Sequence, residues 1–171
     1  MSFGIAILRA VVGGLFIGHG MQKLLGKFGG HGLDGTAGFF ESLGLRPGKV
    51  HATAAGVAET GGGALLVAGA ATPLAASAIT GTMTMAIKKV HAPKGPWNTE
   101  GGYEYPLVLM AIAACLAFTG PGEYSLDHAF GLSLRGDGWG IAAVLAGVAG
   151  SLLIRVIGSL GRSRAGQQAT A

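Results

Sequence analysis

Residues 3–25 read FGIAILRAVVGGLFIGHGMQKLL, an apolar run long enough to cross the ~30 Å hydrocarbon core of a bilayer as a helix. Three ionisable side chains interrupt this run: Arg9, His19 and Lys23. It lacks the basic start and the cleavage site of a signal peptide, so we expect a retained helix. The stretch therefore predicts an integral membrane protein.

The composition of the whole chain agrees with this prediction. Half of the 171 residues are hydrophobic and only 12% are charged, whereas a soluble domain has about 25% charged residues. Glycine is abundant, at 33 residues, and small residues let transmembrane helices approach closely. A chain of this length also favours a single domain.

Further apolar segments predict an all-α integral membrane helix bundle, with a four-helix core and a fifth transmembrane helix. After residues 3–25, the expected spans are residues 50–71, 74–90, 105–119 and 139–160. A short amphipathic helix at 36–45 is expected to lie in the membrane interface. We divide the chain into the core at 1–132, the additional helix at 133–160, and a polar, disordered tail at 161–171.

The basic residues predict the orientation in the membrane. With five spans, one side of the bilayer collects Lys23, Lys27, Arg46, Lys49, Lys88, Lys89, Lys94, Arg162 and Arg164, and the opposite loops hold only Arg135. The positive-inside rule then places the N-terminus outside a bacterial inner (cell) membrane and the first and third loops in the cytoplasm. No basic stripe interleaved with aromatics is present, so nucleic-acid binding is not expected.

Ionisable residues inside the spans are the main functional clue, because each is costly at membrane depth. At ~100° per residue, Arg9, Phe16, His19 and Lys23 share one face of the first helix. Thr80, Thr84, Lys88 and His91 share one face of the third in the same way. Glu59 should lie within about 8 Å in depth of both Arg9 and His19.

Two interpretations of these residues stay open. In the first, Arg9, His19 and Glu59, with Lys23 and His91, line a ligand pocket or proton path. In the second, an Arg9–Glu59 ion pair fixes the helix registry. We favour the first, because several ionisable groups converge. Lys23 and Lys88 are also compatible with snorkelling toward the interface.

The histidines and the cysteine suggest other chemistry only weakly. His19 and His91 could approach each other, but no HxxxH or HExxH spacing exists, so haem is only weakly supported and no metal site is predicted. His31 and His51 are expected to be solvated. Cys115 lies in an apolar run with no basic neighbour, which predicts a buried, inert thiol.

Three motifs together carry a family resemblance: R-x9-H-G-x2-K at residues 9–23, AETGGGALLVAGAATPLAA at 58–76, and GPGEYSLDHAFG at 120–131. Over residues 5–132 the chain resembles the DoxX/DoxD-like family of small membrane proteins. The resemblance implies a four-helix membrane core and, in some members, a subunit of quinone-linked oxidation of sulfur compounds or of redox-stress defence. By match to the motifs, the implied functional residues are Arg9, His19, Lys23, Glu59, Glu104, Ser125 and Asp127.

Two hypotheses of function follow. In the first, the chain is a subunit of a quinone-linked oxidoreductase system, in which Arg9 or His19 bonds a quinone oxygen and Glu59 balances charge or exchanges protons. Electrons would come from a partner subunit or a bound haem, so whether this chain is itself an enzyme stays open. The alternative is a non-enzymatic scaffold, transporter or cargo-binding protein. The lipid bilayer is the expected surrounding in both, and glycine faces at Gly56 and Gly63 could pack within the bundle or between protomers.

Overall fold

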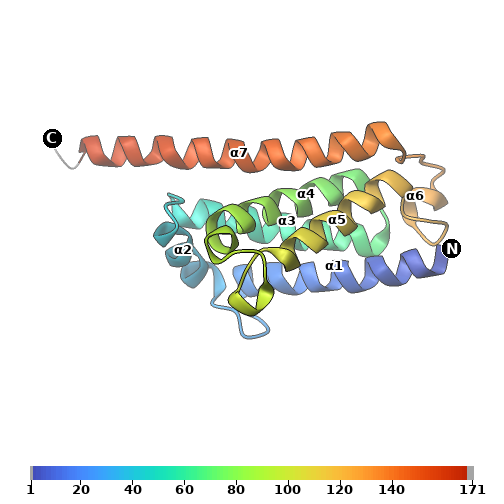
Figure 1. Cartoon of the computed structure of the whole chain (residues 1–171), viewed down its shortest axis with the longest axis horizontal. Helices are drawn as coiled ribbons and strands as arrows, with labels where there is room; N and C mark the ends of the chain where they lie inside the picture. The colour runs from blue at the N-terminus through green and yellow to red at the C-terminus, as the bar shows by residue number, and fades with distance from the viewer. Residues whose placement is uncertain (1, 169–171) are drawn as a thin grey trace.

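In the computed structural model, the described residues 2–168 form an all-α bundle without strands, and side-chain surroundings are described through residue 154. The long helices are α1 (Ser2–Leu25), α3 (Gly48–Ala68), α4 (Thr72–Ala86), α5 (Glu104–Thr119) and α7 (Asp137–Gln168). Two short helices, α2 (Gly32–Ser42) and α6 (Leu126–Ala129), lie at opposite ends of the bundle (Figure 1). The predicted all-α class is confirmed.

The long helices pack in a continuous series. α1 packs on α3, α3 on α4, and α4 on α5, while α7 lies along α4 and α5. Figure 1 shows α1 and α7 on opposite edges of the bundle, with the N-terminus beside α6. α1 and residues 137–154 of α7 are long and apolar enough to cross a membrane, and α5 is a shorter apolar helix. The chain is therefore a helical membrane bundle.

Glycines set the close contact between α1 and α3. A Cβ atom placed on Gly13 would lie 2.6 Å from the Gly63 oxygen, and one on Gly20 would lie 2.6 Å from the Gly56 oxygen. Such distances are shorter than carbon–oxygen packing allows, so only glycine fits at these crossings. Gly56 and Gly63 therefore pack within the bundle.

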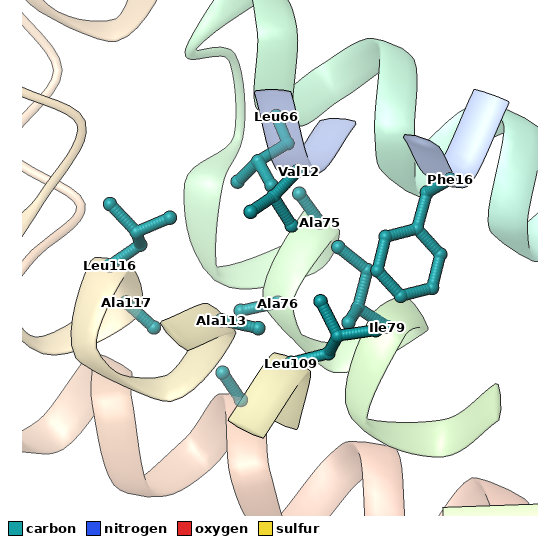
Figure 2. Close-up of a cluster of buried hydrophobic side chains, with 11 residues drawn as sticks. Val12, Phe16, Leu66, Ala75, Ala76, Ile79, Leu109, Ala113, Leu116 and Ala117 are labelled. Atoms are coloured by element: carbon teal, nitrogen blue, oxygen red, sulfur yellow. The ribbon is translucent and has the colours of Figure 1, made fainter. Parts of the chain in front are cut away.

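Small and branched side chains fill the space between the long helices. The core joins Val12 and Phe16 of α1, Leu66 of α3, Ala75, Ala76 and Ile79 of α4, Leu109, Ala113, Leu116 and Ala117 of α5, and Ala143 of α7. Figure 2 shows the alanines where α4 and α5 meet, with Phe16 and Ile79 facing each other. Because alanine contributes little bulk, the helices approach closely enough for packing contacts to hold them together in lipid.

Two element boundaries differ from the sequence prediction. The helix expected at 74–90 ends as an α-helix at Ala86 and continues as a π-turn, η1 (Ile87–His91), followed by the 3₁₀ turns η2 (Ala92–Lys94) and η3 (Asn98–Glu100). At the other end, α7 continues through residues 161–168, which the prediction placed in the tail, and residues 169–171 lie outside the described residues. Arginine, alanine and glutamine in this segment are compatible with helix.

Candidate functional site

A cavity of about 500 Å³ lies in the half of the bundle that contains α2 and η1. Its walls are mainly apolar and include Phe16 of α1, Phe39 and Phe40 of α2, Met83 of α4 and Leu109 of α5. Residues 146–154 of α7 complete the lining. Apolar walls with a few polar groups at this volume are typical of small-molecule sites.

The most buried ionisable group at this cavity is Glu59 of α3. It is 4% exposed, and its Oε2 atom accepts a hydrogen bond from the Lys23 ammonium of α1 at 2.5 Å. Glu59 thus pairs with Lys23 and not with Arg9, so the predicted Arg9–Glu59 pair is wrong. The pairing also shows that Lys23 turns inward to a partner on the neighbouring helix.

Two predicted histidines also line the cavity. His19 lies one turn before Lys23 on α1, and its Nδ1 atom is 3.0 Å from Oε1 of Gln22. His91 closes the π-turn, where its Nδ1 atom is 2.7 Å from the Gly101 oxygen. The structure therefore brings together His19, Lys23, Glu59 and His91, four of the eight residues that the sequence singled out.

Three of the other predicted residues, Arg9, Ser125 and Asp127, lie at the opposite end of the bundle. Arg9 is 2% exposed and donates from Nη1 to the Pro121 oxygen at 2.6 Å and from Nη2 to the Tyr124 oxygen at 2.5 Å. Both hydrogen bonds fasten the segment after α5 to α1. Arg9 therefore does not bond a ligand in the cavity.

Asp127, which is 2% exposed, fastens the same segment to the start of α4. Its carboxylate accepts hydrogen bonds from Ala71 N at 2.7 Å, Thr72 N at 3.1 Å and Thr72 Oγ1 at 2.9 Å. A carboxylate satisfies free N–H groups at a helix start and suits the positive end of the helix dipole. Ser125 begins α6 by accepting from His128 N at 3.2 Å.

Glu104 lies neither in the cavity lining nor with Arg9 and Asp127. It begins α5, and its Oε1 atom accepts a hydrogen bond from Asn98 N at 2.7 Å. This bond closes the loop between η3 and α5. The structure therefore places Glu104 outside the cavity lining.

Sequence reasoning missed several polar groups of the cavity. His51 is 5% exposed and lines the cavity, so the prediction that it is solvated is wrong. Lys89 also lines it, and its ammonium donates to the Leu43 oxygen at 3.0 Å. Ser77, Thr82, Tyr105 and Ser151 are the remaining members. Of these, only His51 carried a sequence signal, because it shares the α3 face of Glu59 eight residues away.

Lys89 reaches the cavity from the face of α4 that Ala78, Thr82 and Met85 share with it at α-helical spacing. Thr80 and Thr84 lie outside the lining. Lys88, which α-helical spacing placed on their face, is exposed. Cys115 is likewise exposed on α5, which contradicts the predicted buried thiol.

Comparison with known proteins gives a coherent picture. A family model described as DoxX matches residues 4–92. A Bacillus subtilis (strain 168) protein named "Putative oxidoreductase CatD" is 33% identical over 126 residues, which cover 74% of this chain and 86% of that protein. No solved structure matches the chain. The matched segment 4–92 contains His19, Lys23, His51, Glu59 and His91 of the cavity.

Proposed function

Because the chain belongs to the DoxX family of membrane proteins, and a similar protein bears an oxidoreductase name, we propose that it is the membrane subunit of a quinone-linked oxidoreductase system. The site of quinone binding in this proposal is the cavity between α1, α3, α4 and α7. The observation that carries the proposal is the Lys23–Glu59 pair at the edge of a mainly apolar cavity.

The shape and lining of the cavity support a quinone as its ligand. A volume of about 500 Å³ is sufficient for an aromatic head group. Phe16, Phe39 and Leu109 offer apolar contacts, while His19 and His91 offer polar ones. A bound quinone would supply two-electron redox chemistry, and these side chains would bind and orient it.

Lys23 and Glu59 have the chemistry to hold a proton near such a ligand. The ammonium carries protons, and the carboxylate retains a second oxygen, Oε1, for which the described residues provide no hydrogen bond. Proton exchange in an apolar pocket requires a donor or acceptor held within reach. We place the electron donor or acceptor on a partner subunit.

The orientation in the proposal follows from the basic loops. Lys27, Arg46 and Lys49 flank α2, at the same end of the bundle as the cavity. The positive-inside rule places this end at the cytoplasmic face of a bacterial cell membrane, with the N-terminus outside.

Quinone that co-purifies with the protein tests the proposal. The full chain is purified in mild detergent, and quinone is extracted and quantified per mole of protein. Ala58→Leu fills the cavity, so we expect it to retain about tenfold less quinone. Ala64→Leu is the matched control, because Ala64 is exposed on the same helix and lies outside the lining. Absence of quinone from every preparation, or full retention in Ala58→Leu, would contradict the proposal and favour a non-enzymatic scaffold or transporter.

A further inference from the structure

The described lining of the cavity carries more positive than negative charge. It contains two ammonium groups, Lys23 and Lys89, and one carboxylate, Glu59. Lys23 is paired with Glu59, so these two charges cancel. Among the residues whose side chains are described, the other ion pair is Lys49–Asp34, so no carboxylate is paired with Lys89. The histidines of the lining are neutral or positive, and they do not balance this charge.

The end of α2 holds the Lys89 ammonium at the wall of the cavity. The ammonium donates a hydrogen bond to the Leu43 oxygen at 3.0 Å, and Leu43 is the residue at which α2 ends. The last carbonyl groups of a helix stabilise a positive charge, so this contact favours an ammonium at this place. An ammonium has three hydrogens, and the described residues provide an acceptor for one of them. The others are available to a ligand.

Two hydroxyl groups add further donors to the lining. Ser77 of α4 and Tyr105 of α5 line the cavity, and the described residues provide no acceptor for either hydroxyl hydrogen. Each can therefore donate to an oxygen of a ligand. Because neutral donors bond a neutral oxygen as well as an anionic one, the charge preference of the cavity depends on Lys89.

We propose that the cavity selects quinones with an ionised ring hydroxyl over neutral quinones, because the Lys89 ammonium lies at a mainly apolar cavity without a carboxylate to balance it. This inference rests on the proposed function and adds the charge of the ligand. A hydroxyl on the quinone ring is acidic, since its conjugate base shares the negative charge with a ring carbonyl oxygen, as in a carboxylate. Such an anion supplies the negative charge that pairs with Lys89, and hydrogen bonds between charged groups are stronger than neutral ones.

The surroundings of Lys89 strengthen this preference. Lys89 is half-buried. Leu43, whose oxygen accepts its hydrogen bond, and Val90, the next residue along the chain, also line the cavity. The attraction between opposite charges grows as water is replaced by apolar groups. A neutral quinone makes the same apolar contacts but gains little from the charge, so the difference between the two ligands lies at the ammonium.

Calorimetric titration of the detergent-purified full chain tests the inference. The probes at neutral pH are 2-hydroxy-1,4-naphthoquinone, which is ionised, and 2-methoxy-1,4-naphthoquinone, which has no proton to lose. We expect the hydroxy compound to bind about tenfold more tightly, as expected when a hydrogen bond between charged groups replaces a weaker one. Lys89→Met should remove most of this preference without changing the affinity for the methoxy compound.

The neighbouring lysine provides the matched control. Lys88 lies beside Lys89 on η1, but it is exposed and lies outside the lining. Lys88→Met removes the same charge from the chain, and it should keep the wild-type preference. Lys89→Gln is a second variant if Lys89→Met does not fold, because its amide can still donate to the Leu43 oxygen. It carries no charge and should also lose the preference.

Each other outcome has a defined meaning. Equal binding of the hydroxy and methoxy compounds overturns the charge preference and leaves the proposed quinone function standing. A preference that survives both Lys89→Met and Lys89→Gln, or that is lost equally in Lys88→Met, overturns the assignment to Lys89. Failure of both compounds to bind overturns the inference together with the proposed function.

Discussion

The Lys23 ammonium lies 2.5 Å from the Glu59 carboxylate and joins α1 to α3 at the edge of the cavity. The lysine side chain is 23% exposed and the glutamate side chain 5%. Removal of one partner of such a pair leaves the other as an uncompensated charge in an apolar site. The pair therefore contributes both to the helix contact and to the charge balance of the cavity.

Glu59→Ala should destabilise the protein by about 3 kcal/mol, because it leaves the Lys23 charge without a partner. The double variant Lys23→Met/Glu59→Ala should recover a large part of this loss, since no unpaired charge remains. Chemical denaturation in detergent, followed by circular dichroism, measures both. A loss in the double variant equal to the sum of the Glu59→Ala and Lys23→Met losses would show that the two residues do not interact.

An exposed ion pair in the same protein is the matched control. Lys49 lies 2.7 Å from Asp34, and the two side chains are 69% and 83% exposed. The hydrogen bond to Asp34, together with its charge, raises the pKa of Lys49. Exposed pairs are screened by water, so Asp34→Ala should leave the denaturation midpoint unchanged.

Arg9 and Glu59 should be energetically independent. Arg9→Met should be strongly destabilising, because it leaves the Pro121 and Tyr124 oxygens without their donor. Combined with Glu59→Ala, the losses should add to within about 0.5 kcal/mol, as expected for sites without shared partners. A coupling larger than 1 kcal/mol, in the same denaturation assay, would restore the pairing that the sequence suggested.

Gly69 should not tolerate a side chain. It ends α3 at φ 63°, and a Cβ atom would lie 2.5 Å from Ser125 Cβ and closer still to the Arg9 guanidinium. Gly69→Ala should therefore cost the ~1 kcal/mol of left-handed backbone and an added steric term. Gly131→Ala isolates the backbone cost, because Gly131 has φ 67° with open space around its Cβ position. Equal thermal midpoints for the two variants would rule out the steric contribution.

Cysteine accessibility should show on which side of the membrane each end of the bundle lies. In a Cys115→Ser background, Lys27→Cys and Lys49→Cys should react with a membrane-impermeant maleimide only after the cells are opened. Phe130→Cys, at the end that holds α6, should react in intact cells. The opposite pattern, or labelling of all three positions in intact cells, would overturn the N-outside orientation.

The bundle could be predicted from the sequence because long apolar runs and glycine-rich faces are properties of single helices. Apolar length identified α1 and α7, and small residues identified the face where Gly56 and Gly63 meet α1. Helical periodicity also placed His19 and Lys23 on one side of α1. These features depend on neighbours along a single helix, so they can be read without tertiary structure.

The errors arose where segments that are distant in the sequence meet. The expected depths of Arg9 and Glu59 in the membrane were similar enough for the two side chains to meet. In the structure, Arg9 instead bonds two backbone oxygens that lie 112 and 115 residues further along the chain. His51 is buried although it lies beside a loop, a position that suggested solvent. Thr80 and Thr84, which were expected to share an inward face with Lys88, lie outside the cavity, whereas Thr82 and Lys89 line it.

Photoaffinity labelling with an azido-quinone is the most direct test of the central claim that the cavity is a quinone site. In membranes containing the full chain, peptide mass spectrometry should locate the label on segments that line the cavity, chiefly 39–45 of α2 and its C-terminal end and 81–91 of α4 and η1. Unlabelled quinone should compete with it, and Ala58→Leu should suppress it while Ala64→Leu does not. Label spread over exposed positions such as Val11 of α1 and Leu145 of α7, insensitive to competitor and to Ala58→Leu, would contradict the claim.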